Sequence, residues 1–282
     1  MALRLAISGF GRIGRMVLRA LVESGRDDVE IVLINTPGPV DASAHLYEFD
    51  SVHGRAQGSF THGDGWMDVG RGRIAMTHER DPSAIPHAAH GIDIVLECSG
   101  HFNTRDKAAA HLDGGARRVL VSAPCKSPDA TIVYGVNHHE ITSDMLVISN
   151  ASCTTHGLAP VAHVMAESVG IEAGYMTTIH AYTGDQPTLD SSHKDLRRAR
   201  AAAPACTQST SRTAGRRPKN CTATIATSGC FRAARNSRQR RNRMGRHRAF
   251  HVLGFKHRPV GGAFQLPPRA PRLRHSRARA QG

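Results

Sequence analysis

The chain has few aromatic residues and no long apolar run. Aromatic residues make up 5% of its 282 residues, including one tryptophan. No apolar stretch approaches the roughly 18 residues that a membrane-spanning helix needs. The first residues run directly into a strand pattern, without the apolar segment and cleavage site of a signal peptide. The 6 cysteines form no CxxC pair. We therefore expect a soluble, cytoplasmic protein in a reducing environment, with no membrane association and no metal site.

Acidic residues are missing from residues 201–282, which contain 17 Arg and 2 Lys. Residues 1–200 hold the remaining 18 basic side chains and all 23 acidic ones, so the net charge of +14 comes from the end of the chain. Apolar periodicity also fails after Ala203, leaving only short apolar islands such as Phe250–Phe255. Such a segment cannot offset its ordering entropy by burial. We expect residues 204–282 to form a basic, mostly disordered tail that attracts polyanions non-specifically.

The first 150 residues alternate between strand and helix patterns. Leu3–Ser8 reads as a buried strand, a helical pattern follows, and Val29–Ile34 reads as a second strand. This order is a βαβ unit. Helical spacing recurs over Thr104–Leu112, and further strands are expected at Ile92–Leu96, Val119–Val121, Thr131–Tyr134 and Leu146–Ile148. The pattern predicts an α/β fold, a doubly wound Rossmann-type parallel sheet, over residues 1–150.

A glycine-rich turn lies between the first strand and the first helix. Gly9, Gly11 and Gly14 have the spacing GxGxxG, which lets the backbone turn tightly and lets a pyrophosphate rest on a helix N-terminus. An acidic residue that holds the ribose hydroxyls usually closes the second strand. Here Asn35 and Thr36 stand at that position, and no carboxylate occurs before Asp41. The turn predicts dinucleotide binding.

Cys153 lies where a strand pattern changes to a helical pattern, which Leu158–Val169 continues. A helix N-terminus favours a thiolate. His180 ends another strand pattern, Gly174–His180, and a thiol with a distant histidine is the minimum for a nucleophile and its base. His156 lies three residues beyond Cys153 and is expected to be a surface histidine. Residues 151–203 are interpreted as a partial α+β catalytic domain.

Several segments occur in an order that resembles phosphorylating glyceraldehyde-3-phosphate dehydrogenase. The resemblance covers about residues 1–203 and rests on the runs GFGRIGR, DSVHG, ECSG, SAP, GVNH, SNASCTT, HAYT and HKDLRRAR. It implies an oxidoreductase in which the thiolate of Cys153 attacks the aldehyde carbon of a triose phosphate. His180 takes a proton as hydride passes to NAD, and inorganic phosphate then attacks the thioester to give an acyl phosphate.

The resemblance also implies the other site residues. Positions that match cofactor contacts are Gly9, Gly11, Arg12, Ile13, Gly14, Asn35, Arg80, Ser99, Gly100 and Ser122. Positions that match ligands of the attacking phosphate or of the substrate phosphate are Ser152, Thr154, Thr183, Asp185 and Arg198. The family is homotetrameric, but the catalytic sheet that builds its interface is mostly absent from this sequence.

The resemblance ends at Ala203. The family's threonine–glycine pair, second phosphate-binding arginine and long catalytic strands do not follow, which suggests translation in a shifted reading frame or a sequencing error. Without those strands we expect little or no turnover. The alternatives are an erythrose-4-phosphate dehydrogenase, which the run HAYT disfavours, a remnant without catalytic activity, and a polyanion-binding basic protein. The tail's few aromatic residues argue against evolved nucleic-acid recognition.

Thr36 generates a prediction about cofactor preference. The family usually has an aspartate there, whose charge favours a free ribose 2′-hydroxyl over a 2′-phosphate. We therefore expect weakened preference for NAD and some tolerance of NADP. Comparing the dissociation constants of the two cofactors for the purified chain tests this expectation. Strong, undiminished selectivity for NAD would refute it.

Overall fold

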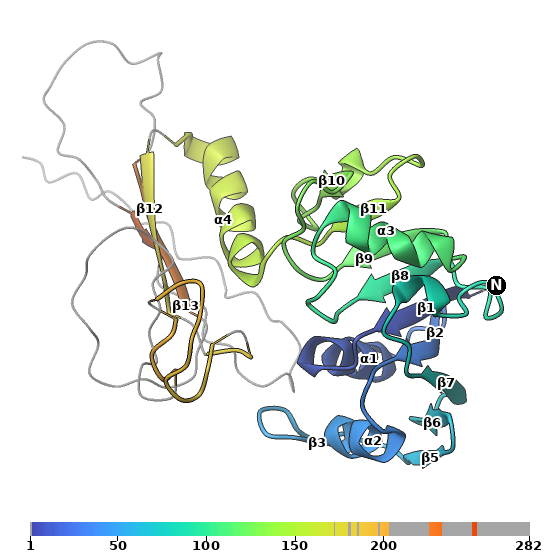
Figure 1. The fold of residues 1–282 in the computed structure, drawn as a ribbon. Coiled ribbons are helices and arrows are strands. Elements are labelled where there is room, and N and C mark those ends of the chain that lie inside the picture. Colours follow the sequence, from blue (N-terminus) through green and yellow to red (C-terminus); the bar gives the residue numbers. More distant parts are fainter. Residues whose placement is uncertain are drawn as a thin grey trace, which may run out of the picture.

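The structure is a computed structural model that describes residues 2–171, 173–179, 182–184, 186–196, 198–202, 226–232 and 250–252. Its main feature is a nine-stranded sheet in the order β10-β11-β9-β8-β1-β2-β7-β6-β5. In this order the strands are Ala130–Thr131, Val147–Ser149, Arg118–Val121, Ile94–Glu97, Leu3–Ser8, Val29–Asn35, Arg73–Thr77, Trp66–Asp68 and Thr61–Gly63 (Figure 1).

Seven strands of this sheet, from β10 to β7, pair in parallel. The expected doubly wound parallel sheet is therefore confirmed. Two antiparallel strands, β6 and β5, extend it beyond β7. The sequence patterns did not indicate this extension, because each of its strands is only three residues long.

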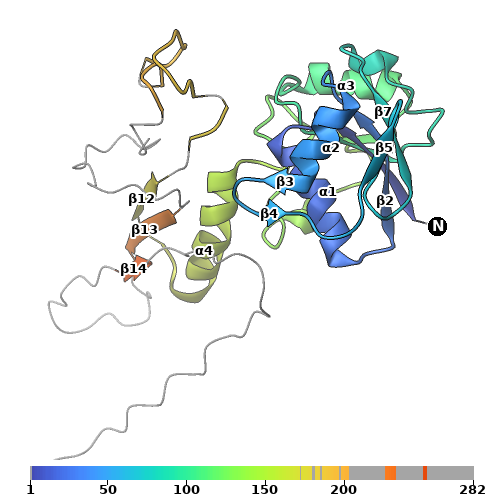
Figure 2. The ribbon, with the colours of Figure 1, turned by 90° about the horizontal axis from the view of Figure 1, so that it is seen from below.

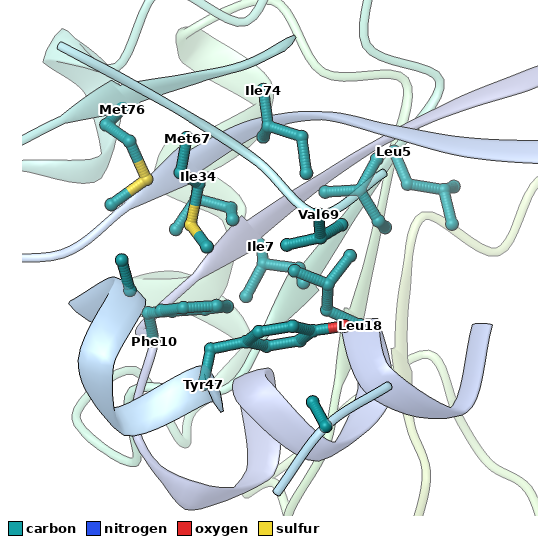
Figure 3. Packing of buried hydrophobic residues seen from close by; sticks show 13 residues of the cluster. Leu5, Ile7, Phe10, Leu18, Ile34, Tyr47, Met67, Val69, Ile74 and Met76 are labelled. Carbon is teal, nitrogen blue, oxygen red and sulfur yellow. The ribbon is translucent and has the colours of Figure 1, made fainter. Parts of the chain in front are cut away.

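Helices cover both faces of the sheet. Those that pack on it are α1 (Arg12–Ser24), α2 (Val40–Glu48) and α3 (Arg105–Asp113). The described residues also form α4 (Cys153–Val169) and two 3-10 turns, η1 (Pro82–Ala84) and η2 (His138–Glu140). Successive residues of β1 point to opposite faces, as a strand requires. Leu5 and Ile7 join one apolar cluster with α1 and α2, whereas Ala6 joins a second cluster with α3. Figure 3 shows the first cluster, in which Leu18 of α1 and Tyr47 of α2 lie beside Ile7.

The expected helix at Thr104–Leu112 is α3, and Thr104 is its N-cap, with a side chain that accepts a hydrogen bond from the amide of Lys107. The strand expected at Thr131–Tyr134 is wrong in extent, because β10 contains only Ala130 and Thr131. The chain turns immediately afterwards. The Asn137 side chain accepts a hydrogen bond from the amide of Val133, whose carbonyl in turn accepts one from the amide of Val136.

A small antiparallel hairpin lies against α1. It consists of β3 (Phe49–Asp50) and β4 (Gly54–Arg55). The buried Arg19 of α1 donates hydrogen bonds to the carbonyl oxygens of His53, Gly54 and Arg55. Figure 2 shows the hairpin beside α1 and α2. Arg19 therefore links the DSVHG segment to the helix that follows the glycine-rich turn.

A second sheet contains β12 (Ala173–Ile179), β13 (Ala226–Arg232) and β14 (Phe250–Val252) in antiparallel order. The strand expected at Gly174–His180 is confirmed as far as Ile179, since His180 lies outside the described residues. Within the tail that was expected to be mostly disordered, two short stretches are described, and both are strands. One of them overlaps the apolar island at Phe250–Phe255.

Within the part of the chain that the structure describes, no helix has both the length and the apolar character to cross a membrane. Cys98, Cys125 and Cys153 are free thiols. Burial raises the pKa of Cys98 to about 11, so this thiol is protonated at neutral pH.

Three titratable side chains form a buried row between β8 and α3. Glu97, His111 and His87 are 1%, 0% and 0% exposed. The His87 Nε2 lies 3.1 Å from the His111 Nδ1, and the His111 Nε2 lies 3.1 Å from the Glu97 Oε2. Burial, with smaller contributions from His111 and His90, lowers the pKa of His87 to about 4. His87 is therefore neutral in the folded protein over most of the accessible pH range.

This buried histidine generates a prediction about stability. Between about pH 6.5 and pH 4 the unfolded chain binds a proton at His87 that the folded protein does not bind. The contribution of neutral His87 to the free energy of unfolding is therefore complete above pH 6.5 and decreases as the pH falls to 4. At pH 5 the free energy of unfolding is lower by about 2 kcal/mol for this reason. Urea unfolding at pH 7 and pH 5 measures the loss, and we expect His87→Phe to lose less stability than the wild type over this interval.

The exposed His62 of β5 provides the control, because His62→Gln should leave the pH dependence unchanged. If His87→Phe loses as much stability between pH 7 and pH 5 as the wild type, His87 does not carry the effect.

Candidate dinucleotide cleft and thiol site

The carboxyl ends of five neighbouring parallel strands lie in register at one edge of the sheet. Ser8 of β1 is paired with Asn35 of β2 on one side and with Glu97 of β8 on the other. Val121 of β9 is paired with Glu97 and with Ser149 of β11. The chain passes from β1 through α1 to β2 and from β8 through α3 to β9, so the strand order reverses at β1. Ligands of doubly wound proteins bind at such a switch point.

A cavity of about 310 Å³ lies at this edge. Four of the residues expected to bind a cofactor line it, namely Gly9, Asn35, Arg80 and Ser99. Its other lining residues are Ser8, Pro37, Glu79, His101 and Phe102, which the sequence reasoning missed. Each of these five residues lies within two positions of a predicted contact, and this proximity along the sequence was the only available signal.

The three glycines of the GxGxxG turn have three different surroundings. Gly9 has a φ of +90°, and a Cβ there would lie 2.4 Å from the backbone of Ser99. A Cβ at Gly14 would lie 2.3 Å from the carbonyl oxygen of Gly9 and 2.9 Å from the Ile7 side chain. A Cβ at Gly11 would meet nothing within 4 Å. Gly9 and Gly14 are thus required by packing, whereas the space at Gly11 is open.

This open space lies at the N-terminus of α1. Gly11 is the N-cap of the helix and contributes no side-chain hydrogen bond to the first turn. The first amides of a helix point outward without intrahelical partners and attract anions. Since nothing lies within 4 Å of a Cβ at Gly11, no protein atom fills the space beside this residue, and a phosphate group has room to approach the start of the helix. We call this open space beside Gly11 and the first amides of α1 the cradle. Its position fits the pyrophosphate of a dinucleotide.

Arg12 is held by a buried carboxylate. Its Nη1 and Nη2 lie 2.6 Å and 3.3 Å from the two carboxylate oxygens of Asp50. Burial raises the pKa of Asp50, but the amides of His53 and Val52 and the charge of Arg12 outweigh it and hold that pKa below its usual value. The Arg12 side chain remains 47% exposed beside the turn. Ile13, the next residue, is 51% exposed.

Asn35 connects β2 to the segment that follows β7. Its side-chain amide donates to the carbonyl of Glu79 at 2.9 Å, and its Oδ1 accepts from the Thr77 hydroxyl and the Glu79 amide at the same distance. Thr36 is buried, and its carbonyl lies 2.8 Å from the His78 Nδ1. These contacts place Glu79 and the exposed Arg80 at the cavity, so Asn35 acts through the backbone of its neighbours.

Ser99, Gly100 and Ser122 follow the next two strands. The amide and hydroxyl of Ser99 both donate to the Oε1 of Glu97, at 2.8 Å and 2.5 Å. Gly100 has a φ of +77°, and its carbonyl accepts a hydrogen bond from the Asn103 side chain. The Ser122 amide donates to the carbonyl of Glu97. Of these three residues only Ser99 lines the cavity.

Cys153 is the first residue of α4, as the sequence predicted, and its thiol is exposed. The preceding Ala151 is buried with a φ of +52°, a strained conformation for a residue with a side chain. The Ser152 side chain caps the helix by accepting from the Thr155 amide at 3.1 Å. Its hydroxyl also lies 2.9 Å from the hydroxyl of Thr154. Two expected phosphate ligands therefore lie beside the thiol in one helical turn.

His156, expected to be a surface histidine, is half-buried, and its Nδ1 lies 3.2 Å from the carbonyl oxygen of Ser152. The ring therefore contacts the backbone of the turn that holds the thiol.

The remaining expected residues lie beyond β12. His180 and Asp185 are outside the described residues. Thr183 is exposed, and its amide donates to the Gln186 side chain. Arg198 is half-buried in the following loop, where its amide donates to the Asp195 carbonyl. Their assignment to a substrate-phosphate site stays a prediction.

Comparison with known proteins gives two matches to family descriptions. Residues 3–105 match the NAD binding domain of glyceraldehyde 3-phosphate dehydrogenase, and residues 152–216 match its C-terminal domain. The glyceraldehyde-3-phosphate dehydrogenases of Xanthobacter flavus and Cereibacter sphaeroides are each 63% identical to this chain over 203 residues. That of Pseudomonas aeruginosa is 53% identical over 203 residues.

These alignments cover 72% of this chain but only 60% or 61% of the relatives. The aligned length of 203 residues agrees with the point where the sequence resemblance was expected to end. The match to the C-terminal domain continues slightly further, to residue 216.

The different surroundings of the glycines generate a prediction. Gly14→Ala forces a methyl group against backbone and should destabilise the fold by about 1–3 kcal/mol. Gly11→Ala adds a methyl group in open space and should cost about 1 kcal/mol at most, yet weaken NAD binding at least tenfold by obstructing the cradle. Urea unfolding and isothermal titration calorimetry measure the two effects. A stable Gly11→Ala variant with wild-type affinity for NAD would show that no ligand approaches this backbone.

Proposed function

Residues 1–203 belong to the glyceraldehyde-3-phosphate dehydrogenase family, and on that premise we propose that the chain binds NAD at the edge of the nine-stranded sheet. We also propose that Cys153 is the nucleophile in the oxidation of an aldehyde phosphate. The single observation that carries the proposal is the open cradle at Gly11, which lies in the segment matched to the NAD binding domain. Since the chain spans about 61% of its relatives, the activity and substrates of the whole enzyme are part of the proposal.

The residues present fit a dinucleotide. The first amides of α1 and the half-exposed Arg12 would hold the pyrophosphate, with Asp50 fixing the direction of the guanidinium. The cavity with Asn35, Glu79 and Arg80 would hold the adenosine end. When bound, NAD supplies the acceptor for the two electrons that leave the substrate.

Cys153 would act as the nucleophile. Its sulfur would form a bond to the aldehyde carbon, and the alkoxide that results would be protonated or stabilised by nearby donors. After oxidation, the same carbon would be held as a thioester. Backbone amides at the start of α4 point toward this position, and such donors stabilise a developing oxyanion. His180 would accept the proton released during the oxidation, as the family resemblance implies.

The two anionic groups of the reaction have separate proposed ligands. Ser152 and Thr154 would bind the inorganic phosphate, whose oxygen attacks the thioester carbon and expels the Cys153 thiolate, giving an acyl phosphate. Thr183, Asp185 and Arg198 would line the site of the substrate phosphate. The proposed substrates are therefore a triose phosphate and inorganic phosphate.

We also propose that the chain divides into a dinucleotide-binding domain at 1–150, a partial catalytic domain at 151–203 and a basic tail at 204–282. Burial supports a weak second unit, since α4 contains no buried residue. Its Val164 and Val169 are 65% and 47% exposed. A helix that buries no residue fully is held less firmly than an element of the core, and a displacement of about 1 Å at a reacting group costs on the order of a hundredfold in rate.

The proposal predicts cofactor binding with little turnover. The full chain should bind NAD saturably in a calorimetric titration, and NAD should protect Cys153 from iodoacetamide. Reduction of NAD with glyceraldehyde 3-phosphate and phosphate, followed by absorbance, should be at least about a hundredfold slower than for the Xanthobacter flavus relative. Cys153→Ser is the control that identifies the labelled thiol.

The two parts of this prediction fail separately. A folded chain that binds no NAD contradicts the cofactor site. Robust, phosphate-dependent turnover contradicts the expectation of a poorly fixed thiol but supports the assignment of the reaction.

A further inference from the structure

A buried row of hydrogen bonds connects the wall of the dinucleotide cleft to α3 and to the segment before β8. It begins at Ser99, whose amide and hydroxyl donate to the Oε1 of Glu97. The other carboxylate oxygen lies 3.1 Å from the His111 Nε2, and the His111 Nδ1 lies 3.1 Å from the His87 Nε2. Three residues of this row, Glu97, His111 and His87, are at most 1% exposed.

The direction of each hydrogen bond follows from the charge on Glu97. Burial raises the pKa of Glu97, but hydrogen bonds from His111 and Ser99 outweigh it and hold that pKa below its ordinary value. The carboxylate can only accept, so the His111 Nε2 carries a proton. One of the two facing ring nitrogens of His111 and His87 must donate to the other. If the His87 Nε2 donates, both rings carry their proton on Nε2.

The far end of the row agrees with this assignment. The His87 Nδ1 is buried and has no hydrogen-bond partner. Burying an unprotonated ring nitrogen without a partner costs less free energy than burying an N–H donor without a partner. The opposite tautomer would place such a donor at this nitrogen. The surroundings of His87 therefore favour the same proton positions that Glu97 requires.

The near end of the row shapes the cleft. Ser99 lines the cavity, and its backbone is so close to Gly9 that a Cβ at Gly9 would lie 2.4 Å away. The Ser99 hydroxyl also accepts a hydrogen bond from the amide of His101, another lining residue. Movement of Glu97 would thus move the wall that faces the glycine-rich turn.

We propose that Glu97 and His111 are positioning residues for the bound dinucleotide, with His87 fixing the tautomer of His111. They touch no cofactor themselves and act by holding Ser99 against Gly9, with His101 attached to the Ser99 hydroxyl through its amide. This inference rests on the proposed NAD site. It goes beyond that proposal, because none of the three side chains lines the cavity.

Two substitutions interrupt the row and one preserves its main contact. In Glu97→Gln the Ser99 amide, which can only donate, keeps the side-chain oxygen on its side, so the NH2 group faces the His111 Nε2 and should force both rings into the Nδ1–H tautomer. His111→Leu removes the donor to Glu97. His111→Gln keeps a donor near the position of the Nε2 and should rescue the contact. The matched control is His90→Gln, a histidine from the same segment as His87 that lies outside the row.

The experiment compares the full-length variants by calorimetric titration with NAD and by amide hydrogen exchange, under conditions where all are folded. In Glu97→Gln and His111→Leu, we expect NAD to bind at least tenfold more weakly and the Ser99 amide to exchange at least tenfold faster. The amide of Val95, buried in the same strand, should be unchanged. His111→Gln and His90→Gln should stay within about threefold of the wild type. Imidazole ¹⁵N shifts should show the proton of His111 on Nε2 in the wild type and on Nδ1 in Glu97→Gln.

The possible failures are distinct. If the wild type binds NAD and the interrupted variants bind it equally well, or if the Ser99 amide is unaffected in them, the positioning role is wrong and the NAD site stands. If the folded wild type does not bind NAD, the proposed function fails, and the positioning role fails with it.

Discussion

The close approach of Gly9 to Ser99 is the contact on which the rest of the cleft depends. It brings the ends of β1 and β8 together at the point where the strand order reverses, and a side chain at Gly9 would collide with the Ser99 backbone. Gly14 packs in turn against the carbonyl of Gly9, which sets the start of α1 close to the sheet. With both neighbours fixed, the open space at Gly11 becomes a defined cradle in front of the helix amides.

Buried polar side chains hold the residues around the cleft in place through hydrogen bonds. Asn35 holds the segment that carries Glu79 and Arg80, Asp50 holds Arg12, and Glu97 holds Ser99. Each is buried and has at least two hydrogen bonds, so each compensates the cost of removing a polar group from water. Buried side chains thus set the positions of the groups that line the cleft, and Asn35 also lines it itself. This arrangement limits the reorganisation that a ligand must drive.

Sequence patterns predicted the parts of this architecture that repeat locally. The first βαβ unit, α3 and the start of α4 at Cys153 followed from apolar spacing and from the glycines of the first turn. The extent of β10 did not, because Val133 satisfies the apolar pattern of a strand while Asn137 binds its amide and ends the strand. The row from Ser99 to His87 left no signal. Its members are separated by irregular intervals along the chain, and only the packing of α3 on β8 and η1 brings them together.

The cleft and the Cys153 thiol differ in the interactions that hold them in place. Among the residues that the structure describes, every buried member of the two apolar clusters lies between Leu5 and Val147, so these clusters support the cleft and do not include Cys153. The thiol is positioned by local features instead, namely the strained turn at Ala151 and the Ser152 cap. A cap contributes about 1 kcal/mol, whereas burial of a large apolar side chain contributes about 1.5–3 kcal/mol for each residue. Since α4 contributes no buried side chain, the start of its helix is specified locally while its position relative to the cleft is not. Dinucleotide binding can therefore persist in a chain whose thiol is poorly aligned for reaction.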